Sequence, residues 1–325
     1  MTRVVVTGVG AVSPLGIGVD ALWSGLTEGR SGIRHIQHFD TSDLDVKIAG
    51  EVPDFVPRDF MDFKAAKRMD RFAQFAVAAA REAMEMANLQ VTEDNHERIG
   101  IMMNTGGGGF PVIEHEVAVM AKSGSKRVSP FLIPMFAPNM ASCQVAMQFG
   151  IHGPTATSVA ACAAGIQAFV DAVHMIERGD ADVVITGGTE GGITPVAIAS
   201  LSNMGALSKR NDDPQGASRP FDLGRDGFVF SEGSGAAILE SEEHAIKRGA
   251  TPLAYVGGGA YTCDAFHITA PDPEGRGASR AMKMAMSRSG LQPHDFQYVA
   301  AHATATGLGD IAETGSIKKA FGGGN

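Results

Sequence analysis

The stretch Thr155-Ala156-Thr157-Ser158-Val159-Ala160-Ala161-Cys162 decides the fold, because it runs directly into a helical pattern. Residues 155–161 predict a strand, and a helix is expected from about Cys162 to Arg178. Gly179 is placed to end that helix, and a further strand is expected from Ala181. The helix carries apolar residues at the spacing of one face, namely Ile166, Phe169, Val170, Val173 and Ile176. The stretch therefore predicts a strand-helix-strand crossover with Cys162 at its turn.

Short apolar runs elsewhere alternate with helical patterns. Val4–Thr7, Ile99–Met103 and Val183–Thr186 each read as a strand near a glycine-rich turn. The segment Ala65–Leu89 reads as an amphipathic helix, with Phe72, Phe75, Ala76 and Ala79 on one face. This alternation predicts an α/β fold with largely buried strands.

The chain also contains a weak internal repeat, here called the internal echo. Arg3–Gly10 has a counterpart in Leu253–Gly259, and each begins a series of strand and helix patterns. The second series comprises a strand near Leu253, a helix over Ala278–Ser289, a strand over Gln297–Ala301 and a helix over Asp310–Phe321, before a turn signal at Gly322–Asn325. We therefore expect two related halves, 1–251 and 252–325, of which the second is incomplete.

Composition excludes several classes of protein. The net charge is −9 with dispersed Lys and Arg, so a nucleic-acid partner is not expected. The three cysteines are far apart and have no metal-ligand spacing, so neither a disulfide nor structural zinc is expected. The amino terminus lacks a signal-peptide pattern, and prolines interrupt the apolar stretch Phe131–Met147. These features predict a cytoplasmic protein without a membrane span.

Cys162 is the first candidate for chemistry. Its small neighbours leave room for a substrate, and the start of a helix favours a thiolate, which is a nucleophile. A buried structural cysteine is the alternative, and it is the preferred interpretation for Cys143 and Cys263.

His302 is the second candidate, because it ends a predicted strand and precedes Thr304 and Thr306. Most single histidines are structural, which is the alternative here. The glycines of Gly8-x-Gly10 and of Thr105–Gly109 lack the remaining residues of dinucleotide and phosphate loops. They predict close backbone packing or a pocket wall, and no cofactor is expected.

Several segments taken together resemble the type II β-ketoacyl-acyl carrier protein synthases. They are Arg3–Gly10, Val159–Gly165, Gly187–Glu190, Ser218–Asp222, Arg225–Val229 and Ala301–Thr306. The resemblance covers the whole chain. It implies a thiolase-like fold of two related halves, with mixed five-stranded-type sheets and a buried nucleophile helix, and a homodimer.

The resemblance also implies a reaction. Cys162 would accept an acyl group from acyl carrier protein. His302 would be the first of two catalytic histidines, which promote decarboxylation of malonyl-acyl carrier protein and stabilise the enolate that attacks the acyl thioester. Thr304, Thr306 and Thr269 would contact the phosphopantetheine arm, and Glu313 would have a structural role near the centre.

Two further expectations follow from the resemblance. A basic patch of Lys64, Lys67, Arg68, Lys126 and Arg127 would dock the acidic carrier protein, with a solvated helix face as the alternative. Gly107 stands where the family often has a bulky residue lining the acyl pocket, so longer acyl chains should be tolerated and Gly107→Ile should change chain-length selectivity.

The chain also departs from the family pattern. That pattern continues past Asn325 into a Lys, a second His and a glycine-rich tail with a Phe that completes the oxyanion hole, so we expect a fragment with impaired acyl transfer and no condensation. Ala303 replaces a common Gly, and Gly307 a common Pro. The alternatives are a coenzyme A thiolase, a non-catalytic chain-length partner, and an inert module for carrier-protein binding or dimerisation. Cys162 argues against the chain-length partner.

Overall fold

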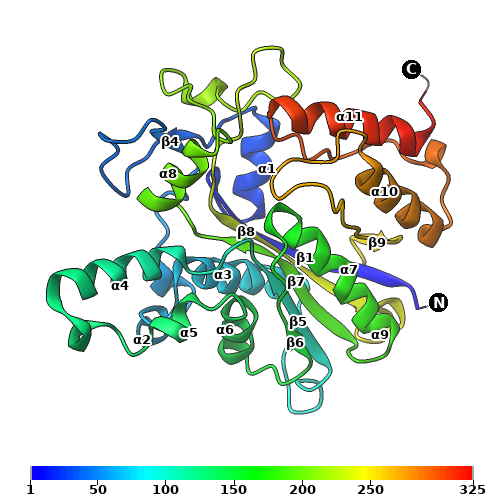
Figure 1. Cartoon of the computed structure of the whole chain (residues 1–325). Coiled ribbons are helices and arrows are strands. Elements are labelled where there is room, and N and C mark those ends of the chain that lie inside the picture. Colours follow the sequence, from blue (N-terminus) through cyan, green and yellow to red (C-terminus); the bar gives the residue numbers. More distant parts are fainter. Residues whose placement is uncertain (1, 324–325) are drawn as a thin grey trace. The chain divides into compact units, whose positions relative to one another are not determined.

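The computed structural model describes residues 2–323 (Figure 1), so Gly324 and Asn325 of the expected terminal turn lie outside it. The described chain forms two compact units, each made of several segments. The first contains the chain up to Gly32, Gly50–Ala197 and Ser231–Val256, and the second contains Ile33–Ala49, Ile198–Phe230 and the chain from Gly257. The division expected between residues 251 and 252 stays a prediction.

A mixed sheet is the centre of the first unit (Figure 1). Its strand order is β2-β1-β8-β7-β5-β6, and β9 also pairs with β1. β5 runs parallel to β6 and β7, whereas β8 runs antiparallel to β7 and β1. The strands are β1 Val4–Ser13, β2 Gly16–Ile17, β5 Ile99–Asn104, β6 Thr155–Ala156, β7 Val183–Glu190, β8 Gly233–Ser241 and β9 Ala254–Val256.

Helices cover both faces of this sheet. Side chains alternate between the faces along each strand. On β5, Ile101 and Met103 pack with α3 (Arg71–Met86) and α6 (Met140–Phe149), whereas Met102 packs with α7 (Ala164–Glu177) on the other face. Strands buried on both faces read as continuous apolar runs, which is why the sequence marks them clearly.

The helix predicted over residues 65–89 is two helices, α2 (Phe63–Ala66) and α3. The Asp62 side chain accepts backbone N–H bonds at the start of α2, and a separate turn at 67–70 precedes α3. The predicted apolar face of α3 is confirmed, because Phe72, Phe75, Ala76 and Ala79 are all fully buried.

The remaining elements are shorter or lie in the second unit. In the first unit they are α1 Val19–Thr27, η1 Pro57–Asp59, α4 Phe110–Ser123, η2 Ser125–Arg127, α5 Leu132–Phe136, η3 Ala161–Ala163 and α9 Glu242–Lys247. α8 (Pro195–Asn203) begins in the first unit and ends in the second. In the second unit they are β3 Arg34–His35, β4 Ile48–Ala49, η4 Pro214–Gly216, α10 Arg276–Ser289, η5 Pro293–Asp295 and α11 Gly307–Phe321.

The crossover predicted around Cys162 is present, with two corrections. The strand is only Thr155–Ala156, because the Thr157 hydroxyl bonds the Met103 carbonyl and only the Thr105–Val159 bridge continues the pairing. The buried face of α7 contains Val170 and Ile176 as predicted, together with Ala164, Ala168, Ala172 and Met175, whereas Ile166 is 70% exposed. The start of the helix approaches the sheet closely at Gly165 and Gly188, and Ile166 lies on the other side of the helix there.

The second half of the sequence matches its predicted elements in part. α10 and α11 form as expected, but the strand predicted over Gln297–Ala301 is absent from the described structure. Tyr298 is 82% exposed there, and strand propensity alone does not make a strand without a partner to complete the ladder. The two echo segments pair with each other, because β9 lies antiparallel to β1 with Val4 opposite Val256.

Candidate active site

Cys162 lies in η3, the single turn that leads directly into α7. Its side chain is exposed and forms no disulfide. Ala161, the residue before it, has φ 45°, a left-handed conformation that alanine adopts at a cost of roughly 1–2 kcal/mol. The start of α7 is pressed against β7, since a Cβ on Gly188 would lie 3.0 Å from the Gly165 Cα. Cys162 is thus presented by a strained turn at the beginning of a fixed helix.

The glycine run after β5 packs beside this turn. A Cβ on Gly106 would lie 2.8 Å from Glu190 Oε2 and 3.6 Å from the Ala161 Cα, so the run approaches the Cys162 turn closely because it lacks side chains. The Gly106 N–H donates to Glu190 Oε2 at 3.1 Å. The sequence predicted close backbone packing for this run, and Gly106 shows such packing.

Gly107 has a specific neighbour. A Cβ there would lie 2.4 Å from the Phe110 ring, which is 45% exposed. A side chain at position 107 would therefore occupy the space that the Phe110 ring fills. The Gly107→Ile substitution requires Phe110 to move, and the assignment of Gly107 to an acyl pocket stays a prediction.

Two carboxyl groups flank the glycine run, the buried Asp70 and the half-buried Glu190. Asp70 is 4% exposed; its Oδ2 accepts the Val112 N–H at 2.9 Å, and its Oδ1 has no hydrogen-bond partner among residues 2–323. Burial raises the pKa of Asp70 to about 6. Burial also raises the pKa of Glu190, and the nearby Asp70 charge adds to that effect.

We predict that Asp70→Asn stabilises the protein more at pH 7.5 than at pH 4. Between pH 3.8 and about 6 the folded carboxyl keeps a proton that the unfolded chain releases, so the parent's free energy of unfolding falls as pH rises through this window. The full effect above that window is up to ~3 kcal/mol. Urea unfolding of both proteins at the two pH values measures it. The exposed Asp59→Asn is the control, and an equal Asp70→Asn effect at both pH values contradicts the prediction.

His302 lies on a loop of the second unit that α11 holds in place. The Glu313 carboxylate accepts two backbone N–H bonds, from His302 at 2.6 Å and from Ala303 at 2.8 Å. Ala303 has φ 51°, so this bidentate contact maintains a left-handed residue. His302 itself is exposed. Glu313 therefore fixes the backbone from which the imidazole projects.

Asp310 holds the next part of the same loop. It is 2% exposed, and it accepts the Ala305 N–H at 3.1 Å and the Phe221 N–H at 2.7 Å. Both donors are left-handed residues, with φ 60° and 64°. Arg225 Nε lies 3.3 Å from the Asp310 carboxylate and 3.0 Å from the Thr306 carbonyl. One buried carboxylate thus ties the segments 221–225 and 305–306 together.

The three predicted pantetheine threonines separate into two groups. Thr304 and Thr306 hydroxyls lie 2.9 Å apart, and Thr306 also caps α11 by accepting the Gly309 N–H at 3.1 Å. Thr269 lies on another loop, where its hydroxyl is 3.3 Å from His267 Nδ1. The structure groups His302 with Thr304 and Thr306 and gives Thr269 no contact with them.

The predicted basic patch belongs to the first unit. Lys64 lies on α2, Lys67 and Arg68 follow it, and Lys126 and Arg127 lie in η2; all five are exposed. The Arg68 guanidinium stacks over the Phe131 ring at 4.7 Å, which brings the end of α2 next to the chain that follows η2. The five cations therefore come from two neighbouring segments.

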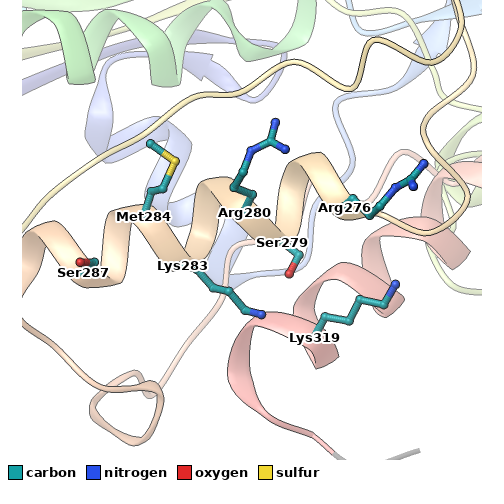
Figure 2. Close-up of a pocket in the computed structure, with 7 residues that line it drawn as sticks. All are labelled: Arg276, Ser279, Arg280, Lys283, Met284, Ser287 and Lys319. Carbon is teal, nitrogen blue, oxygen red and sulfur yellow. The ribbon is translucent and has the colours of Figure 1, made fainter.

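A further basic hollow of about 520 Å³ lies on α10 and α11 in the second unit (Figure 2). Figure 2 shows Lys283 reaching from α10 towards α11, which carries Lys319. Lys319 donates to the Glu274 carbonyl at 2.6 Å, and Arg276 pairs with the buried Asp272 at 2.8 Å. None of the predicted site residues lines this hollow, whose lining is Arg276, Ser279, Arg280, Lys283, Met284, Ser287 and Lys319.

Residues 2–323 contain no cluster of three or more His, Cys, Asp or Glu side chains able to hold a metal ion. None of their helices combines the length and apolar character needed to cross a membrane.

Sequence reasoning missed two buried carboxylates, Asp70 beside the glycine run of the first unit and Asp310 in the His302 loop of the second unit. Asp70 precedes an apolar helix and reads as a routine cap, whereas its side chain reaches the start of α4. Asp310 follows Gly309 in the same motif as His302 and could have been found there.

Comparison with known proteins gives consistent matches. The family described as beta-ketoacyl synthase, N-terminal domain, matches residues 1–245, and beta-ketoacyl synthase, C-terminal domain, matches residues 253–325. The chain is 49% identical over 320 residues to 3-oxoacyl-[acyl-carrier-protein] synthase 2 of Synechocystis sp. and 47% identical to the protein of that name from Staphylococcus aureus. Each match covers 98% of this chain and 77% of the relative.

Solved structures agree with the sequence matches. The ishigamide ketosynthase/chain length factor superposes with a TM-score of 0.91 at 33% identity, covering 99% of this chain and 78% of that one. A beta-ketoacyl synthase from Burkholderia phymatum gives 0.90 at 32% identity, covering 99% and 79%. The predicted thiolase-like α/β fold is thereby confirmed. The chain belongs to the β-ketoacyl synthase family.

Proposed function

We propose that the protein catalyses the decarboxylative condensation of an acyl thioester with malonyl-acyl carrier protein in fatty-acid elongation. The observation that carries the proposal is the position of Cys162, exposed on a strained turn at the start of α7. The unpaired N–H groups of a helix's first turn favour a thiolate there. The relatives named 3-oxoacyl-[acyl-carrier-protein] synthase 2 support the same reaction.

The proposed first half-reaction is acyl transfer. The Cys162 thiolate attacks the carbonyl carbon of the acyl thioester, and the tetrahedral oxyanion collapses as the pantetheine thiolate leaves and takes up a proton. In the second half-reaction, malonyl thioester loses carbon dioxide, and the resulting enolate attacks the acyl-Cys162 carbonyl and expels the Cys162 thiolate. His302 is proposed to donate a hydrogen bond to the enolate oxygen, with Glu313 fixing the backbone beneath it.

Acyl carrier protein is the proposed donor of both substrates. A solved neighbour with a TM-score of 0.88, at 31% identity, is a type II polyketide ketosynthase in complex with its acyl-carrier protein; the match covers 99% of this chain and 78% of that one. We place the docking surface on Lys64, Lys67, Arg68, Lys126 and Arg127. Thr304, Thr306 and Thr269 are the proposed pantetheine contacts, although the Thr306 hydroxyl also caps α11.

We predict that Arg68→Glu raises the KM for acyl carrier protein roughly tenfold, because charge reversal weakens electrostatic steering of an acidic partner. The value of kcat should change by less than twofold. Steady-state kinetics over a range of salt concentrations measure both, and the difference from the parent should shrink as salt rises. The control is Lys247→Glu on α9, which reverses an exposed charge elsewhere in the first unit. Equal effects of the two substitutions would remove Arg68 from the docking surface.

A homodimer is proposed from an apolar surface of the first unit. α4 exposes Ile113, Val117 and Met120 at helical spacing, with Val117 63% and Met120 57% exposed. The edge strand β6 is exposed as well. A second copy of the chain is the proposed occupant, because large exposed apolar patches and open strand edges mark association sites.

We expect the double substitution Val117→Glu and Met120→Glu to convert the dimer to a monomer, because two charges would have to be buried in an apolar contact. Size-exclusion chromatography with light scattering measures the mass of the particle. Lys122→Glu, on the same helix, should leave the dimer intact. A parent protein that is monomeric at micromolar concentration contradicts the proposal.

The test of function is incubation of the purified protein with acyl- and malonyl-acyl carrier protein. Mass spectrometry should find an acyl adduct on Cys162, and a β-ketoacyl product on the carrier protein when the family's second catalytic histidine is present in the protein assayed. Acyl transfer from coenzyme A in preference to the carrier protein would favour a thiolase, and binding without an adduct would favour an inert docking module.

A cytoplasmic location is also proposed, since the three cysteines form no disulfide.

A further inference from the structure

Asn104 is a buried amide at the end of β5, directly before the glycine run. Its side chain is fully buried, and burial of an amide is unfavourable unless both of its polar atoms are paired. Both are paired with the segment that carries Cys162. Asn104 Oδ1 accepts the Ser158 N–H at 2.7 Å, and Asn104 Nδ2 donates to the Ala164 carbonyl at 3.0 Å.

These two hydrogen bonds fix the orientation of the amide. The oxygen faces an N–H donor and the nitrogen faces a carbonyl acceptor. A flipped amide would place donor against donor and acceptor against acceptor. The side chain is therefore a two-armed clamp of defined direction, with one arm on each side of Cys162.

The chain between the two arms is strained. Ser158 and Ala164 bracket Ala161, whose φ of 45° is unfavourable for a residue with a Cβ. A conformation of this kind persists only where surrounding contacts over-determine it. Inside the bracket, the Ala163 N–H bonds the Ala160 carbonyl at 3.0 Å, and Val159 forms a bridge to Thr105. Asn104 supplies the contacts that hold the two ends of this turn together.

The clamp acts where Cys162 gains its reactivity. Ala164 is the first residue of α7, so the Nδ2 arm fixes the helix start relative to β5. A thiolate at a helix start is stabilised only while it stays close to the N–H groups of the first turn, since that effect is confined to the end of the helix. Displacement of a reacting group by about 1 Å can cost a hundredfold in rate.

We propose that Asn104 is a positioning residue for Cys162: it holds the strained turn 158–164 so that the thiol stays at the start of α7. The inference rests on the proposed function, in which Cys162 accepts the acyl group. It assigns the buried end of β5 a role in the reaction although Asn104 does not contact the reacting atoms.

The test measures the reactivity of Cys162 without substrate. Asn104→Ala removes both arms, and Asn104→Asp retains the acceptor for Ser158 but turns an acceptor towards the Ala164 carbonyl. Iodoacetamide alkylation of Cys162 is followed by peptide mass spectrometry from pH 5 to 10. In both variants we expect the apparent pKa of the thiol to rise and the alkylation rate at pH 7 to fall at least tenfold.

Thr186→Val is the matched control. The Thr186 hydroxyl is equally buried and donates to the Met102 carbonyl at 3.2 Å within the same sheet, so its hydrogen bond does not go to the turn. This variant should alkylate within twofold of the parent. Thermal unfolding identifies any variant that does not fold. Asn104→Asp preserves the size of the side chain, so it keeps the test informative if Asn104→Ala fails.

The two hypotheses fail in different ways. If folded Asn104 variants alkylate with the parent's pH profile, Asn104 is not a positioning residue. If the parent forms no acyl adduct on Cys162 with acyl-acyl carrier protein, the proposed function fails, whereas the alkylation comparison remains valid. When both hold, Asn104→Asp should lower kcat for acyl transfer at least tenfold and leave the KM for the carrier protein within twofold.

Discussion

Cys162→Ala should abolish formation of the acyl adduct and of the β-ketoacyl product. The physical reason is that the sulfur forms the covalent bond in both half-reactions, and deletion of a covalent nucleophile typically costs on the order of 10⁶ in kcat. Intact-mass measurement after incubation with acyl-acyl carrier protein checks adduct formation, and product on the carrier protein checks turnover. Carrier-protein binding should persist, because the proposed basic patch lies on α2, the two residues that follow it and η2, and does not include Cys162.

Cys143→Ala and Cys263→Ala are the matched controls for this prediction. Neither is the buried cysteine expected from the sequence, because Cys143 is half-buried on α6 and Cys263 is exposed on a loop of the second unit. Both variants should keep the adduct and the product. A Cys162→Ala protein that still carries an acyl group would overturn the assignment of the nucleophile.

Asp310→Ala should destabilise the protein by about 3–5 kcal/mol, the typical cost of removing one partner of a buried ion pair. Arg225 would lose its counterion, and the N–H groups of two left-handed residues, Phe221 and Ala305, would lose their acceptor. Urea unfolding measures the change. Activity should fall as well, because Ala305 belongs to the same loop as His302.

Asp295→Ala is the control for Asp310→Ala. Asp295 accepts the Gln292 N–H at 2.8 Å in an exposed capping turn of the same unit, and its loss should cost about 1 kcal/mol. Asp310→Asn should fall between the two, because an amide keeps one acceptor but loses the charge. If Asp310→Ala and Asp295→Ala lowered the free energy of unfolding equally, the hydrogen bonds and ion pair of Asp310 would not be what holds this loop in place.

The sequence predicted the parts of the fold that depend on burial. The apolar runs of β5 and β7 and the face of α3 are all present, because strands and helices buried by their neighbours carry a regular apolar pattern. The turn at Cys162 was also predicted. The family match then located His302 and its threonines as a group, and the loop 302–306 does contain them together.

The contacts that hold the site could not be predicted in the same way. Asn104, Asp70 and Asp310 act through hydrogen bonds to backbone groups up to 89 residues away in the sequence, and no local pattern encodes such partners. The exposed Ile166 shows the converse error, since a large apolar residue was assigned to the buried face of α7 although it lies in solvent. Residues 297–301 likewise have strand propensity, but propensity does not supply the neighbouring strand that a sheet requires, and no strand forms there.

The pairing of β1 has a consequence for how the chain is made. Val4–Val12 lies against Ser234–Ser241 and Val4–Val6 against Ala254–Val256. Apart from the short hairpin with β2, which pairs only Val12 and Ser13, the first strand to leave the ribosome therefore waits for its partners until more than 200 residues follow. At synthesis rates of 5–20 residues per second, this delay is about 10–50 s. During that time Val4 and Val5, both fully enclosed in the finished protein, face solvent. Such long-range closure predicts slow folding and dependence on chaperones during synthesis.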